Sequence, residues 1–137
     1  MNIIEVLNTK KNMFQKIEAL ANRQEKLACD NLMDEYLQLS KQRDLIKNDI
    51  EADNKKYKYL FEKVDQKDRE MVMTMKKEIS EVIKSIMDID KRVEQLVSEK
   101  RTEILGEIKG LKKGRTAVKG YRNKKVSTQP RFIKTVG

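Results

Sequence analysis

The chain has 137 residues, of which 39% are charged and 5% aromatic, and it contains no histidine, no tryptophan, one proline and one cysteine. This composition is typical of long solvated helices with narrow apolar seams, and it excludes a compact enzyme core and the nucleophilic or metal sites that depend on histidine. The hydrophobic content of 38% is nevertheless too high for a fully disordered chain.

The net charge of +9 is concentrated at the C-terminal end of the sequence. No acidic residue follows Glu107, whereas ten of the 31 lysines and arginines do, so residues 1–107 hold 21 basic and 22 acidic side chains. The first part of the chain is therefore close to neutral, and the excess positive charge belongs to the tail.

Cys29 is the single cysteine, so no disulfide can form within the chain, which favours a reducing compartment. No apolar run approaches the roughly 20 residues of a membrane span, and the first residues lack the basic region and apolar core of a signal peptide. We expect a cytoplasmic protein without membrane insertion.

An amphipathic helix is predicted for residues 3–28, because apolar residues recur there every three or four positions, with Lys10 and Gln24 as interruptions. Asp30 is a suitable N-cap for a new helix, and acidic residues that suit a first helical turn follow it. We therefore expect a kink or short break near Asp30, with a continuous helix as the alternative.

A second helix shows heptad spacing of apolar residues, with Arg43 inside its seam. We expect Arg43 to pack its aliphatic stem in the seam while its guanidinium reaches water. The periodicity continues to Val64 but is weakened at Asp53 and Asn54, whose side chains compete for backbone hydrogen bonds. The polar run at residues 65–70 is the natural reversal point, and a short reversal makes neighbouring helices antiparallel.

The longest predicted helix runs from Met71 to Leu111 and carries an unbroken heptad seam. The seam consists of Met75, Ile79, Val82, Ile86, Ile89, Val93 and Leu96. Such a seam requires another helix alongside it. The predicted fold is all-α, an elongated antiparallel three-helix bundle or coiled coil over residues 1–105, followed by a basic, partly flexible segment over 106–137.

Gly106, Gly110 and Gly114 fall four residues apart near the end of the long helix. Each costs roughly 1 kcal/mol of helix stability relative to alanine. They indicate a groove for close approach of another helix, a marginal helix that orders on a partner, or simple fraying. Methionines at Met71, Met73, Met75 and Met87 are expected chiefly as core filler, with an adaptable binding surface as the alternative.

No catalytic constellation, phosphate-binding loop or metal-ligand set is visible, so we expect no enzyme activity, no cofactor, no metal and no small-molecule substrate. The basic tail is compatible with a nucleic-acid arm, a membrane-surface helix or a segment that binds a partner helix. The third interpretation fits the glycines best. It would present Ile104, Ile108, Leu111, Val118 and Tyr121.

The run from Leu27 to Ile46, the ending from Leu111 to Tyr121 and the short stretch from Gln129 to Ile133 together resemble the FlgN/FliT-like flagellar type III export chaperones. Members of that family carry a Gly-Asp type of break, a Gly-Arg-x-Ala-x-x-x-Tyr run and a terminal Arg-Phe-Ile-Asp. This chain departs from the pattern at Cys29, where the family often has glycine, and at Lys134, where it often has aspartate.

The resemblance implies a cytoplasmic, non-enzymatic chaperone that binds the helical end of a hook-associated or filament-cap protein, keeps it from assembling early and delivers it to the export apparatus. It further implies that the C-terminal helix holds the client. The corresponding residues here are Ile104, Ile108, Leu111, Arg115, Val118 and Tyr121.

Two functions of other classes remain as alternatives. A self-associating coiled-coil scaffold would use the same seam, whereas a helical nucleic-acid-binding protein would use the tail and would be retained on DNA in a salt-dependent way. An export chaperone without its client is expected to be a monomer or a weak dimer.

Overall fold

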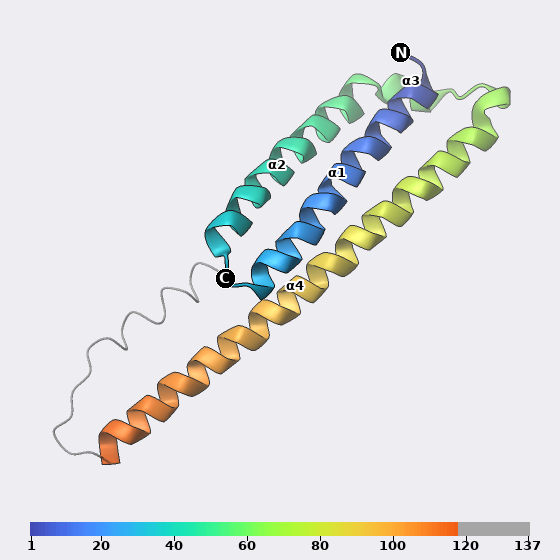
Figure 1. Cartoon of the computed structure of the whole chain (residues 1–137). Helices are drawn as coiled ribbons and strands as arrows, with labels where there is room; N and C mark the ends of the chain where they lie inside the picture. Colours follow the sequence, from blue (N-terminus) through green and yellow to red (C-terminus); the bar gives the residue numbers. More distant parts are fainter. Residues whose placement is uncertain (118–137) are drawn as a thin grey trace. The chain divides into compact units, whose positions relative to one another are not determined.

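The structure is a computed structural model that describes residues 1–117, with side chains described to residue 111. Its elements are α1 (Ile3–Cys29), α2 (Met33–Lys56), α3 (Lys58–Glu62), the 3-10 turn η1 (Gln66–Asp68) and α4 (Arg69–Ala117), shown in Figure 1. The described residues form only helices and their connections, which confirms the all-α prediction.

The chain divides into two compact units, Met1–Arg92 and Val93–Gly137. The first unit contains α1, α2, α3, η1 and the N-terminal half of α4, and the described part of the second unit is the C-terminal half of α4. The domain boundary predicted between residues 105 and 106 was drawn from composition, and it stays a prediction.

Successive long helices in the first unit run antiparallel, as predicted. Hydrogen bonds join Gln24 of α1 to both Ser40 and Arg43 of α2, so positions late in α1 face positions early in α2. The ion pairs Lys11–Glu78 and Glu25–Arg92 span the same sequence separation of 67 residues, which shows that α4 runs parallel to α1 here. Figure 1 shows the resulting alternation in this unit, in which α1 runs downward, α2 upward and α4 downward in the view.

The core of the first unit consists of apolar clusters where these helices meet. One cluster joins Ile3, Leu7, Val72, Met75 and Ile79, and another joins Ile17, Ile50 and Ile86. Each large side chain removed from water here contributes about 1.5 to 3 kcal/mol before the entropy of ordering is subtracted. The heptad seam predicted for the long helix is therefore confirmed within this unit, where four of its members are buried and Val82 is half-buried.

The connection between α1 and α2 is a sharp break at the predicted place. Asn31 adopts a left-handed conformation with φ of 60°. The backbone N–H of Leu32 donates to the carbonyl of Leu27 at 2.9 Å, and that of Asn31 donates to the carbonyl of Ala28 at 3.3 Å. This is the Schellman pattern, which satisfies carbonyls left open at a helix end and places a glycine or asparagine in the left-handed position.

The predicted role of Asp30 at this break was wrong. Asp30 is the C-cap of α1, and the N-cap of α2 is Leu32, whose side chain makes no capping hydrogen bond. The break therefore comes from how α1 ends rather than from how α2 begins. Asn31 was the local signal, because asparagine tolerates the left-handed region better than other residues with a Cβ do.

The segment that leads into the reversal before α4 also differs from the prediction. The apolar periodicity predicted one helix that continues to Val64. α2 ends at Lys56 with Tyr57 as its C-cap, and the chain re-forms a single short helix, α3, before turning. Leu60 and Phe61 of α3 pack against the cluster around Leu7. The apolar period therefore continues in the sequence because those residues cover the end of the core, although the helix itself is interrupted.

The interpretation of the methionines as core filler holds for Met75 but is wrong for its three neighbours on α4. Met71, Met73 and Met87 are all more than half exposed, whereas Met75 is buried. They lie outside the seam because their helical positions differ from those of the seam residues by one or two residues. Among the described helices, none has the length and hydropathy that crossing a bilayer demands.

We predict that Asn31→Ala destabilises the protein by about 1 kcal/mol, because a Cβ disfavours the left-handed conformation and alanine lacks the local hydrogen bonding of asparagine. Asn31→Gly should leave the free energy of unfolding unchanged or slightly higher. Urea denaturation followed by circular dichroism measures both, with Asp30→Ala as the neighbouring control. Equal stability of the alanine and glycine variants would show that the left-handed residue does not limit the turn.

Candidate functional site

The residues predicted to bind a partner lie at the C-terminal end of α4, in the second unit. Ile104 and Ile108 are half-buried and Leu111 is 48% exposed. Arg115 belongs to α4, but its side chain lies beyond the described side chains, and Val118 and Tyr121 lie outside the described residues. The structure therefore brings the first three together on one helix and does not test the other three.

Ile104, Ile108 and Leu111 fall within a narrow sector of the helix surface. At about 100° per residue, their positions span roughly 60° around the axis, and at 1.5 Å per residue they extend about 10 Å along it. Leu105, which the sequence interpretation omitted, is 46% exposed and widens the sector on one side. We call Ile104, Leu105, Ile108 and Leu111 the α4 stripe.

The glycines of this region do not belong to the α4 stripe. Gly106 and Gly110 each lie two residues from Ile108, which places them about 160° away around the helix. A Cβ added at either glycine would meet nothing within 4 Å. The described residues therefore show no close approach at these positions, and the physical effect of the two glycines is to lower helix stability, by roughly 1 kcal/mol each.

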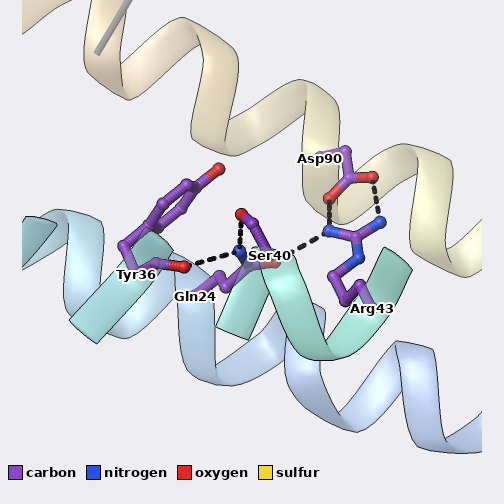
Figure 2. Close-up of polar contacts among 5 residues, drawn as sticks. All are labelled: Gln24, Tyr36, Ser40, Arg43 and Asp90. Atoms are coloured by element: carbon purple, nitrogen blue, oxygen red, sulfur yellow. Dashed lines mark hydrogen bonds and ion pairs between the residues drawn. The ribbon is translucent and has the colours of Figure 1, made fainter. Parts of the chain in front are cut away.

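A second candidate site lies inside the first unit, and it is polar. Its centre is Arg43, for which the sequence predicted a guanidinium in water. The guanidinium of Arg43 on α2 donates from Nη1 and Nη2 to the two carboxylate oxygens of Asp90 on α4, at 2.8 Å each. Nη1 also donates to Oε1 of Gln24 on α1, at 2.8 Å. We call these contacts of the Arg43 guanidinium with Asp90 and Gln24 the fork. Figure 2 shows how the fork joins the three helices. The snorkelling prediction for Arg43 was wrong, because a carboxylate and an amide oxygen are available within the bundle.

Gln24 is only 1% exposed and its amide is fully engaged. Its Nε2 donates to the carbonyl of Tyr36 at 3.1 Å and to the hydroxyl of Ser40 at 2.7 Å, as Figure 2 shows. A buried amide is tolerated when its donors and its acceptor are paired, since an unpaired polar group loses its hydration without compensation. Gln24 interrupts the apolar seam of α1, and it is the residue through which α1 takes part in this network.

The electrostatics of the network favour a permanently charged arginine. The hydrogen bonds to Asp90 raise the pKa of Arg43, against the opposing effect of burial. Burial and the nearby Asp90 carboxylate raise the pKa of the Tyr36 phenol, which therefore stays neutral at physiological pH. The network contains no nucleophile paired with a base, so its chemistry is positional: it sets how the three helices align.

Sequence reasoning missed Asp90 and the role of Gln24. The available signal was a pair of polar residues, Gln24 and Arg43, at seam positions of two neighbouring helices, with a carboxylate directly after the seam residue Ile89. Two polar seam residues facing each other predict a buried network when a charge of the opposite sign can reach them.

The fork should contribute measurable coupling energy. In a double-mutant cycle with Arg43→Met and Asp90→Asn, we expect a coupling of about 1 to 2 kcal/mol, because charge-assisted hydrogen bonds in a partly buried site exceed exposed ones. Arg43→Lys should destabilise as well, since lysine cannot form the two-pronged contact. Urea unfolding of each variant measures this, with the exposed Arg23→Met as the matched control. If Arg43→Met left the free energy of unfolding unchanged, the snorkelling interpretation would be restored.

The exposed ion pair between Glu25 and Arg92 predicts a pH effect. The hydrogen bond from Arg92 lowers the pKa of the Glu25 carboxyl in the folded protein, with the Arg92 charge acting in the same direction. The folded state then binds fewer protons, so this contribution to stability is present above the ordinary pKa of about 4.5 and is lost as the pH falls through the lowered value.

In an NMR titration of the Glu25 side-chain carboxyl, Arg92→Gln should raise that pKa toward its ordinary value, while the exposed neighbour Lys91→Gln should leave it nearly unchanged. The slope of stability against pH below about 4.5 should become shallower in the Arg92 variant alone. A Glu25 pKa that is the same in both variants would contradict the pairing.

The comparisons with known proteins add no relative on which to base a function. No protein-family model, curated protein or solved structure matches this chain.

Proposed function

We propose that this chain is a non-enzymatic binding protein that holds an amphipathic helix of another protein on the α4 stripe, as a flagellar type III export chaperone. The observation that carries the proposal is the exposure of Leu105 and Leu111 beside the half-buried Ile104 and Ile108, on one sector of a continuous helix. Helices bind partner helices through apolar anchors spaced at i, i+3, i+4 and i+7, and Ile104, Ile108 and Leu111 fill the i, i+4 and i+7 positions.

Charge argues for one kind of occupant, an amphipathic helix with acidic flanks. The sequence from residue 108 onward carries ten basic and no acidic residues, whereas residues 1–107 are nearly neutral. Opposite charge on a client helix would steer the encounter, and like charge would oppose it. The excess of charge next to an apolar stripe also argues against self-association through this segment, because two copies would bring the same positive charge together.

The size of the α4 stripe favours a reversible complex. Four side chains over about 10 Å bury less than the 1,200 to 2,000 Å² of a standard stable interface, so Arg115, Val118 and Tyr121 are proposed to extend the contact. The helix-weakening glycines add an ordering cost on binding. Moderate affinity suits a client that must be released for export.

The proposed client is the helical end of a hook-associated or filament-cap protein, which the chaperone keeps unassembled and delivers to the export apparatus in the cytoplasm. This part of the proposal derives from the resemblance of the Leu27–Ile46 and Leu111–Tyr121 segments to FlgN/FliT-like chaperones. The α4 stripe, which was identified from the helix geometry, falls in the segment that those proteins use for the client.

The test compares two leucines of equal chemistry in the full-length chain. Leu111→Asp should weaken binding of a fluorescent peptide from the helical end of the hook-associated protein about tenfold or more, since a carboxylate in an apolar contact is poorly solvated. Leu45→Asp, at a leucine of α2 that is also exposed, should leave the affinity unchanged. Fluorescence anisotropy measures both, and truncation after Glu103 should abolish binding.

Equal affinity of the two aspartate variants would remove the α4 stripe from the mechanism. Absence of binding to every hook-associated and cap peptide would reject the export-chaperone assignment. Sedimentation velocity at several concentrations addresses the scaffold alternative, because a stable oligomer that Leu111→Asp disrupts would identify a second copy of the chain as the occupant.

A further inference from the structure

A cavity of ≈ 450 Å³ lies at one end of the first unit and is lined by all of its helices. Its lining residues are Leu7 and Lys10 of α1, Asn54 of α2, Phe61 of α3, and Lys76, Ile79 and Ser80 of α4. Pockets that hold small molecules in proteins fall in this range of volume and combine apolar walls with a few convergent polar groups.

Two lysines, Lys10 and Lys76, line this cavity, and no carboxylate is among the residues that line it. Among the described residues, neither Lys10 nor Lys76 forms an ion pair with a carboxylate. Burial lowers the pKa of Lys10, and the charge of Lys76 lowers it further, which places the two side chains within electrostatic reach of each other. The ammonium group of Lys76 lies 5.5 Å from the centroid of the Phe61 ring, which also lines the cavity.

Three other basic side chains of the first unit, those of Lys11, Arg43 and Arg92, each pair with a carboxylate of another helix. Lys11 is adjacent to Lys10 on α1, and it pairs with Glu78 of α4, two residues from Lys76. Carboxylates are thus available close by in the sequence of α4, yet the cavity itself is lined by none.

We propose that this cavity binds a small organic anion, whose acidic group lies between the ammonium groups of Lys10 and Lys76 and whose apolar body packs against Leu7, Phe61 and Ile79. Asn54 and Ser80 supply neutral hydrogen-bonding groups at the rim. The apolar floor is well formed, because Leu7 and Ile79 are buried and belong, with Phe61 packed against them, to one core cluster.

Binding of an anion here relieves a repulsion that the free protein retains. Two like charges near a partly buried site disfavour each other, and an anion between them converts both contacts to attraction. Because the ligand would bind only the folded bundle, it would also raise the apparent stability of the protein. The site lies wholly within the first unit, so it is independent of the helix-binding function proposed for the α4 stripe.

The experiment titrates the ¹⁵N-labelled full-length protein with hexanoate and follows the backbone amide signals by NMR. We expect saturable shifts at Leu7, Lys10, Phe61 and Ser80, with a Kd between about 0.1 and 10 mM as befits a small ligand. Hexanol, which lacks the charge, and acetate, which lacks the apolar chain, should each bind about tenfold more weakly.

Two variants test the lysines and one serves as their control. Lys10→Gln and Lys76→Gln should each weaken hexanoate binding about five- to tenfold, whereas the exposed Lys77→Gln, with the same change of charge, should leave it unchanged. Ser80→Glu provides an independent test at an exposed position, since its carboxylate would occupy the anion position and abolish binding without disturbing the core.

Absence of saturable shifts with hexanoate would overturn the proposal. So would equal affinity for hexanol, which would indicate an apolar cavity without an anion site, or equal weakening by the Lys77 control, which would indicate a nonspecific charge effect. Failure of peptide binding at the α4 stripe would leave this result unaffected, because the two experiments report on different residues.

Discussion

The guanidinium of Arg43 is the contact on which the alignment of the first unit depends. It joins α2 to Asp90 of α4 and to Gln24 of α1 at 2.8 Å each. An apolar heptad seam stabilises helix packing but repeats every seven residues, so it tolerates shifted alignments. The fork does not, because a shift of one residue moves a side chain by about 1.5 Å along the helix and 100° around it. The apolar clusters supply most of the stability, and the polar network selects one register.

That register has consequences at both ends of the first unit. It places Lys11 opposite Glu78 and Glu25 opposite Arg92, with the same sequence separation in each pair. It also brings Lys10 and Lys76 to one cavity, and no carboxylate is among the residues that line this cavity. The two lysines give this cavity a local positive charge within a nearly neutral part of the chain.

The second unit has a different physical character. Its described part is a single helix on which the apolar α4 stripe is partly open, and Gly106 and Gly110 lie on the opposite side of the helix. Low helix propensity and exposed apolar anchors favour a segment that gains order from a partner. The two candidate sites are thus built differently: the cavity is formed by several helices packed in register, whereas the stripe needs only the periodicity of one.

This difference explains what could be predicted. Helix periodicity is local, so the sequence by itself predicted the three long helices, the reversal before α4 and the shared helix face of Ile104, Ile108 and Leu111, and it indicated a break near Asp30 without identifying Asn31 as its cause. Leu105 was missed only because it stands beside the strict spacing. The partner of Arg43, the role of Gln24 and the meeting of Lys10 with Lys76 join residues from different helices. Only the tertiary structure decided these, because which side chains face one another depends on the relative register of packed helices, and the spacing within any one helix contains no information about it.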